Sequence, residues 1–242
     1  MNDTTLLFGI HAVTEAIKSK TTIDKLFIQK GLKGELIKEL MNLINKEGIS
    51  YKSVPFEKLN KLTSKNHQGI VAYISPVKFW NLEELVESSL TKKEPTFFIL
   101  LDRITDVRNF GAIIRSAECV GADGIIISKS ESAPVNGDCI KTSAGAIFNV
   151  PICKVDHLKD AIYHLQSYDI QVIAATEKTD TNMHDINYSK KAALIMGSEG
   201  KGIHKSILNI VDEKAKIPMK GTINSLNVSV AAGILMYKIT KN

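Results

Sequence analysis

The sequence predicts an α/β protein whose larger part is a doubly wound parallel sheet, and three observations support this fold class. From residue 96 onward, strand-like and helix-like segments alternate repeatedly along the chain. Several strand segments are continuous apolar runs, such as AALIM at 192–196, and such runs are typical of parallel strands covered by helices on both faces. The 242 residues, 44% of them hydrophobic, suffice for one large domain or two modest ones.

The elements of this larger part follow from the alternating pattern. We expect strands at 97–101, 125–128, 150–154, 171–175, 192–196 and 214–217, and helices at 110–119, 137–143, 157–168, 203–210 and 227–239. Ligands in such sheets bind beyond the carboxyl ends of the strands, so the loops after 97–101, 192–196 and 214–217 are expected to form the site. The last helix is apolar nearly all round, which predicts that it is buried.

The first 75 residues form a separate pattern typical of a small α/β domain. Helices are expected at 11–20, at 35–47 and shortly after Pro55, and strands at 25–29, 51–54 and 69–74. Ser75-Pro76 interrupts the pattern, Asn81 can cap a helix that runs to Leu90, and residues 92–95 are polar and end in proline. The predicted organisation is therefore a domain at 1–75, a linker with one helix at 76–95, and a domain at 96–242.

Composition excludes several classes of protein. The start of the chain lacks a secretion signal and its densest apolar run, at 97–101, is too short to span a bilayer, so we expect a cytoplasmic protein without a membrane segment. The three cysteines, Cys119, Cys139 and Cys153, are odd in number and show no CxxC spacing, which predicts free thiols. The six histidines show no metal-binding spacing, so no metal is expected.

The charge of the chain is unevenly distributed. Residues 1–75 carry eleven lysines against seven carboxylates, whereas the remaining residues are nearly balanced within a net charge of +5. This bias suits a phosphate backbone, although a solvated lysine-rich surface would look the same. Only three arginines occur, Arg103, Arg108 and Arg115, all in one stretch, which favours recognition of phosphate or carboxylate there. A structural ion pair is the alternative interpretation.

The three loops contain distinct motifs. In the first, Asn109 is placed to cap a helix that carries Arg115. The second, GSEGKG at 197–202, has three glycines between a strand and a helix, which lets backbone approach a ligand closely. It fits neither a Walker A loop nor the GxGxxG fingerprint, so an NTPase or an ordinary dinucleotide site is disfavoured. The third loop runs from 217 to 229, into the apolar helix.

Together these loops resemble the three signature motifs of the SpoU/TrmH family of RNA 2′-O-ribose methyltransferases. The matching strings are N-x-G-x-x-x-R at 109–115, GSEGxG at 197–202, and IPM at 217–219 leading to SLNVS at 225–229. FGIHAV at 8–13 and NHQGI at 66–70 are similar to the N-terminal domain of the bacterial 23S rRNA guanosine-2′-O-methyltransferases within that family.

The resemblance implies a deep trefoil knot in the C-terminal domain, preceded by a small ribosomal-protein-like α/β domain. It implies that S-adenosyl-L-methionine (AdoMet) binds among Thr176, Gly197, Ile217 and Leu226. It also implies structured RNA as the partner, with 23S rRNA favoured, and a homodimer formed through the last helix.

The resemblance assigns the catalytic role to Arg115, oriented with its substrate by Asn109, Glu199, Ser225 and Asn227. A guanidinium does not normally deprotonate in proteins, so Arg115 either acts as a base with help from an RNA phosphate or stabilises the developing alkoxide. Stabilisation of the developing alkoxide is the favoured role. As alternatives, Asn109 could be only a helix cap, Glu199 a partner of a helix dipole, and Ser225 and Asn227 turn residues.

Two other functions stay open on the same fold. The chain could methylate tRNA ribose, although a separate N-terminal domain for substrate choice argues against this. It could also be an RNA-binding or ribosome-assembly protein that no longer catalyses methyl transfer.

Overall fold

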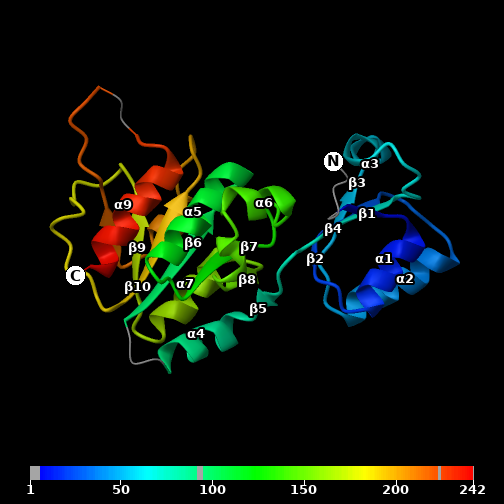
Figure 1. Cartoon of the computed structure of the whole chain (residues 1–242), viewed down its shortest axis with the longest axis horizontal. Helices are drawn as coiled ribbons and strands as arrows, with labels where there is room; N and C mark the ends of the chain where they lie inside the picture. Colours follow the sequence, from blue (N-terminus) through cyan, green and yellow to red (C-terminus); the bar gives the residue numbers. More distant parts are fainter. Residues whose placement is uncertain (1–5, 92–94, 223–224, 242) are drawn as a thin grey trace. The chain divides into compact units, whose positions relative to one another are not determined.

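The computed structural model describes residues 6–91, 95–222 and 225–241 (Figure 1). The chain divides into two compact units, Met1–Lys78 with Pro134–Asp138, and Phe79–Ala133 with Cys139–Asn242. In the described ranges no helix is long and apolar enough to cross a membrane.

The second unit contains a seven-stranded sheet in the order β11-β9-β10-β6-β7-β8-β5. Every neighbouring pair in this sheet is parallel, as predicted. The strands are β5 (Phe79–Trp80), β6 (Thr96–Asp102), β7 (Gly124–Ser128), β8 (Ile152–Val155), β9 (Gln171–Ala175), β10 (Lys191–Gly197) and β11 (Glu213–Ala215). The apolar runs of β6 and β10 are buried along nearly their whole length, because helices cover both faces.

Helices cover the two faces of this sheet in separate groups. They are α4 (Leu82–Leu90), α5 (Val107–Cys119), α6 (Gly137–Thr142), α7 (Leu158–Gln166), α8 (Lys205–Leu208) and α9 (Val228–Thr240), with a 3₁₀ turn at Ala146–Phe148. Helices α4, α7 and α8 share one core with Phe98 and Leu100 of β6. Helices α5 and α9 pack side by side against the other face (Figure 1).

The first unit has a four-stranded sheet in the order β1-β4-β2-β3, in which only β2 and β3 are parallel. Its elements are β1 (Leu6–Phe8), α1 (Ile10–Lys18), β2 (Ile23–Gln29), α2 (Glu35–Lys46), β3 (Lys52–Val54), α3 (Phe56–Leu62) and β4 (Ile70–Ile74). Helices α1 and α2 pack on one face and α3 on the other. Strand β1 was not predicted, because three residues are too few to show a pattern.

Most of the segment expected as a linker, 76–95, belongs to the second unit, and its expected helix is present as α4. Strand β5 pairs with β8 of the second sheet, and Leu85 and Val86 of α4 are buried in its core. A helix with an apolar stripe needs a partner to cover it, and here the partner is this sheet. The predicted cap is confirmed, since Asn81 Oδ1 accepts from the backbone N–H groups of Glu83 and Glu84 at 2.8 and 3.2 Å. Residues 92–94 lie outside the described residues.

Helix α5 begins three residues earlier than predicted, so Asn109 is not its cap. Asp106 caps the helix, and its Oδ1 accepts from the backbone N–H groups of Arg108 and Asn109 at 2.8 and 2.9 Å. A carboxylate at this position satisfies free N–H groups and also interacts favourably with the positive end of the helix dipole. The side chain of Asn109 is therefore free for another role.

Within one chain the last helix is buried on one side only, so the predicted all-round burial would need the homodimer that the resemblance implies. Leu235 and Met236 are fully buried, whereas Val230, Ile234 and Tyr237 are 51%, 37% and 46% exposed. These three positions are spaced by four and three residues, so they form one apolar stripe along α9. Contacts within the chain therefore bury only one side of this apolar helix.

Candidate functional site

A cavity of about 660 Å³ lies at the carboxyl ends of three neighbouring strands, β11, β9 and β10. Its lining comes from residues 175–177, 196–200 with Gly202, 215–217 with Met219, 225–228, and Ala231 and Leu235 of α9. The four residues predicted to bind a cofactor, Thr176, Gly197, Ile217 and Leu226, all line this cavity. Loops separated by up to 50 residues meet here, because parallel strands end at the same edge of the sheet.

The glycine loop at 197–202 folds back on itself beside the cavity. A Cβ on Gly197 would lie 2.3 Å from both the carbonyl carbon of Gly202 and the nitrogen of Ile203. The Gly202 N–H donates to the Ser198 carbonyl at 2.8 Å, and Gly200 and Gly202 have positive φ of 88° and 64°. Gly197 is thus required for a close approach within its own loop, a reason that the sequence did not reveal.

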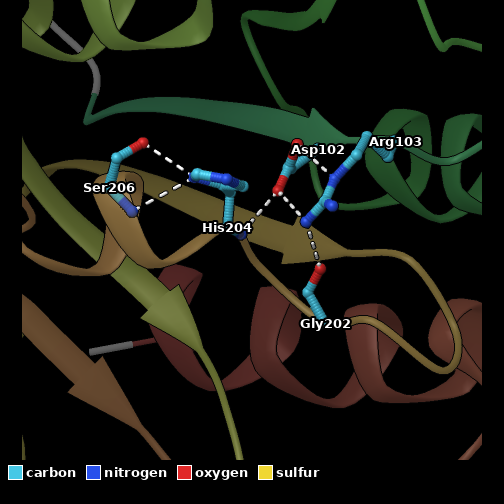
Figure 2. A network of polar contacts seen from close by, with 5 residues as sticks. All are labelled: Asp102, Arg103, Gly202, His204 and Ser206. Carbon is cyan, nitrogen blue, oxygen red and sulfur yellow. Dashed lines mark hydrogen bonds and ion pairs between the residues drawn. The ribbon is translucent and has the colours of Figure 1, made fainter.

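Arg103 fastens this loop to the end of β6 (Figure 2). Its guanidinium donates through Nε and Nη2 to the two carboxylate oxygens of Asp102, at 3.1 and 3.0 Å, and through Nη2 to the Gly202 carbonyl at 3.0 Å. Asp102 also accepts from the His204 N–H at 2.8 Å, and its side chain is 8% exposed. Arg103, one of the three clustered arginines, therefore forms a structural ion pair, which is the alternative interpretation given above.

A polar network joins the first motif to the other two. The Asn109 amide donates to Glu199 Oε1 at 3.2 Å. The Asn227 amide donates to the same oxygen at 2.7 Å and to Asn109 Oδ1 at 3.0 Å. Glu199 and Asn227 line the cavity, so the network borders it. Asn227 is also the cap of α9, because its Oδ1 accepts from the backbone N–H of Ser229 at 3.0 Å.

The other two predicted catalytic residues lie differently. Ser225 lines the cavity and is exposed. Arg115 is exposed on α5 and does not line the cavity. It lies six residues beyond Asn109, which is about 9 Å along the helix axis. The structure of one chain therefore brings together every predicted site residue except Arg115. Residues 223 and 224 of the third loop lie outside the described residues.

Sequence reasoning missed several residues of the site. Glu177 and Lys216 line the cavity next to predicted residues, and their position just after strand ends is the signal that could have identified them. Gly111 of the first motif has a packing reason, since a Cβ there would lie 2.0 Å from the Thr142 Oγ1. Among the described residues, no group of three or more His, Cys, Asp or Glu side chains is placed to hold a metal ion.

The lining of the cavity indicates what kind of ligand it accepts. Ile217, Met219 and Leu226 give apolar contact surface, while backbone groups of the glycine loop supply hydrogen-bonding positions. Glu177 and Glu199 add carboxylates, and Lys216 adds an ammonium group. The volume lies within the range of about 300–1,000 Å³ that is typical of small-molecule and cofactor sites. A ligand with an apolar ring and charged groups of both signs fits this lining.

Comparison with known proteins identifies related sequences over nearly the whole chain. Residues 96–237 match the SpoU rRNA Methylase family, and residues 6–80 match the family described as RNA 2'-O ribose methyltransferase substrate binding. A relative from Staphylococcus haemolyticus, described as a TrmH family tRNA/rRNA methyltransferase, is 34% identical over 234 residues, which is 97% of this chain and 94% of the relative.

Solved structures share the fold. The SpoU methyltransferase AviRb from Streptomyces viridochromogenes, in complex with the cofactor AdoMet, has a TM-score of 0.61 and 21% identity, over 98% of this chain and 89% of that one. The A. aeolicus TrmH/SpoU tRNA modifying enzyme has a TM-score of 0.56 and 30% identity, and covers 66% of this chain and 81% of its own.

Proposed function

The chain belongs to the SpoU rRNA methylase family, and on this basis we propose that it methylates the ribose 2′-hydroxyl of one nucleotide, a guanosine, in 23S rRNA. It is an AdoMet-dependent RNA methyltransferase. The observation that supports methyl transfer at this site is the meeting of all three motif loops at one cavity, joined by the Asn109–Glu199–Asn227 network. The proposed fold includes the trefoil knot of the family, formed by the segments that border this cavity.

The cavity residues suit AdoMet. Ile217, Leu226 and the backbone around Gly197 would hold the adenosine part, and the hydroxyl of Thr176 lies at the adjoining strand end. Carboxylates at the wall are compatible with a positively charged sulfonium. When bound, AdoMet supplies an electrophilic methyl group on that sulfonium. The residues of the chain then need to orient the ribose and stabilise its developing alkoxide.

Arg115 is the proposed electrostatic stabiliser of the 2′-alkoxide. Its guanidinium stays protonated, so a fixed positive charge beside the ribose oxygen lowers the free energy of the transition state. Its exposure leaves it available to an RNA phosphate as well. Asn109, Glu199, Ser225 and Asn227 position the nucleotide from the border of the cavity.

Substitution of Arg115 tests this role. Arg115→Ala should lower the single-turnover rate of methyl transfer from labelled AdoMet to rRNA on the order of a hundredfold, with AdoMet affinity unchanged. Arg115→Lys retains the charge and should recover part of the rate. Undiminished transfer by Arg115→Ala would contradict the assigned role. Absence of AdoMet binding by the wild-type protein would favour the non-catalytic RNA-binding alternative.

The proposed catalytic unit is a homodimer formed through α9. Its stripe of Val230, Ile234 and Tyr237 is exposed in one chain, and contact with a second copy would bury it. The same helix packs against α5 and lines the cavity through Ala231 and Leu235. The proposed interface therefore adjoins both α5 and the cavity. Arg115 of one chain can then act at the cavity of the other chain.

Two experiments test the dimer. Ile234→Glu should convert the protein to monomers in analytical ultracentrifugation, because a carboxylate would be buried in an apolar interface. Mixing Arg115→Ala with Gly197→Ala chains should restore about a quarter of the wild-type rate, since half of the dimers then hold one complete site. Recovery would support action across the interface, and no recovery would place Arg115 in the site of its own chain.

The choice of rRNA rests on the first unit. Residues 6–80 match a substrate-binding family, whereas the tRNA modifying enzyme named above aligns with only 66% of this chain. We place the reaction in the cytoplasm, as the sequence predicts. Mapping 2′-O-methyl groups in total RNA from cells with and without the gene decides the substrate. Loss of one 23S rRNA position supports the proposal, and loss of a tRNA position instead refutes it.

A further inference from the structure

One face of the first unit's sheet carries partly exposed aromatic side chains at neighbouring positions. Phe8 of β1 and Phe27 of β2 both pair with Val71 of β4, so the two rings flank Val71 at one level of the sheet. Tyr73 lies two residues further along β4 on the same face, and its ring meets that of Phe27 edge-on at 6.3 Å. The small core under α3 leaves Phe8 and Phe27 only partly buried.

Helix α3 and the segment after it add a further ring and two lysines. Phe56, the first residue of α3, is 47% exposed, and its ring lies 5.1 Å from that of His67. Lys65 Nζ lies 5.5 Å from the centre of the Phe8 ring, and Lys58 Nζ lies 5.9 Å from that of Phe27. The two ammonium groups thus lie over the rings of Phe27 and Phe8, which brings positive charge onto this aromatic surface.

The positive charge of the first unit is concentrated on this side. Residues 51–69 contain four lysines, at positions 52, 58, 61 and 65, and one carboxylate, Glu57. All four lysines are exposed, and within the described residues none pairs with a carboxylate. On the opposite side, by contrast, Lys18 and Lys20 pair with Glu15 and Glu47. The local excess therefore lies where the rings are.

The two N-terminal motifs, FGIHAV at 8–13 and NHQGI at 66–70, are not part of the catalytic site, and they meet beside this surface. The Gly9 N–H donates to the Ile70 carbonyl at 3.1 Å, and the Ile10 N–H donates to Gln68 Oε1 at 3.1 Å. His67 is buried, and both of its ring nitrogens have partners, in Asn60 and the Gly69 N–H. The loop that carries Lys65 is therefore fastened to the sheet and presents its lysine in a defined place.

We propose that this aromatic–lysine face, made of Phe8, Phe27, Phe56, Lys58 and Lys65, binds unpaired nucleotides of the RNA substrate. The exposed ring of Phe56 can stack on an unpaired base, the partly buried rings of Phe8 and Phe27 extend the apolar surface beside it, and the lysines neutralise phosphates. Double-stranded RNA hides its base faces, so it would use only the lysines. The inference rests on the proposed function in that the RNA is the methylation substrate. It adds which surface of the first unit holds the RNA and in what form.

The test uses the full-length protein and a labelled RNA hairpin with a long unpaired loop, together with its fully paired counterpart. Phe8 and Phe27 support the core, so only exposed residues are changed. Phe56→Ala should weaken binding to the loop RNA about tenfold and leave duplex binding nearly unchanged. Lys58→Ala with Lys65→Ala should make the negative slope of log affinity against log salt shallower by about 1.4, the value for two phosphate contacts on a single strand.

A matched control is Lys38→Ala with Lys46→Ala, which removes two exposed lysines from α2 on the opposite face. This pair should keep wild-type RNA affinity. The proposal would be overturned if the α3-side lysine pair, Lys58→Ala with Lys65→Ala, lost no RNA affinity or lost only as much as the control pair. It would also be overturned if Phe56→Ala weakened loop binding and duplex binding equally. AdoMet binding and circular dichroism confirm that each variant is folded.

The same variants separate this inference from the proposed function. Predicted RNA binding without methyl transfer by the wild-type protein would refute the function and leave the surface standing. Normal methyl transfer by Phe56→Ala and the α3-side lysine pair at subsaturating rRNA would refute the surface and leave the function standing.

Discussion

Substitution of Gly197 by alanine should disable the cofactor cavity while leaving the protein folded. The added Cβ would lie 2.3 Å from two backbone atoms of Gly202 and Ile203, and 2.7 Å from the Gly202 carbonyl oxygen. Ordinary van der Waals contacts are 3.4–4 Å, so this backbone has to move by about 1 Å or more. It cannot swing away as a flexible side chain would.

The structure sets the size of the effect. Overpacking of this kind costs about 1–3 kcal/mol. Movement of Gly202 also strains the hydrogen bond that its carbonyl accepts from Arg103, which contributes about 1–2 kcal/mol. A total of about 3 kcal/mol leaves the competent loop conformation populated in roughly one molecule in 150. Apparent affinity falls in proportion to that fraction, so AdoMet should bind on the order of a hundredfold more weakly.

Isothermal titration calorimetry with AdoMet measures this loss directly. Gly221→Ala is the matched control, because the position belongs to the third loop, has no atom within 4 Å of an added Cβ and lacks a positive φ. The control should stay within about twofold of wild-type affinity. If folded Gly197→Ala bound AdoMet as tightly as the control, the cavity would not be the AdoMet site or the loop would not shape it.

Three further predictions follow from other parts of the second unit. Glu199→Ala should slow methyl transfer to rRNA on the order of a hundredfold in single-turnover assays, with little change in melting temperature, because its network is exposed to water. Arg103→Met should destabilise the unit by about 2 kcal/mol, seen as a fall of roughly 4–8 °C in calorimetry, since it leaves the partner carboxylate buried with fewer donors; an unchanged melting temperature would contradict the role of the clamp. Burial raises the pKa of the Cys153 thiol to about 12, and Cys139 is also buried, so a thiol reagent at pH 8 should label only exposed Cys119 in the native chain and all three cysteines in denaturant; rapid labelling of more than one native thiol would contradict the packing.

Much of the second unit could be predicted from local patterns. Apolar runs such as 192–196, a cap such as Asn81, and glycines between a strand and a helix act through neighbours in the chain, so they can be read without knowing the fold. The motif loops could likewise be recognised. All four predicted cofactor residues then appear at one cavity, because parallel strands share an edge.

Features that depend on distant partners could not be predicted in this way. Strand β5 has two residues and exists because β8 pairs with it, and α4 joins the core because the sheet covers its stripe. The cap of α5, Asp106 rather than Asn109, was missed for a local reason instead, because capping propensity hardly distinguishes these two polar residues.

The sequence by itself determined the α/β class, the order of most elements and the three loops that contain the chemistry. Only the tertiary structure decided that Asn109 meets Asn227, 118 residues later, that Arg103 pairs with Asp102 and binds the glycine loop, and that α9 leaves one apolar side uncovered. The physical reason is the order of strands in the sheet. Local propensity sets which segments become strands, whereas their neighbours in space are selected by burial and pairing over the whole chain.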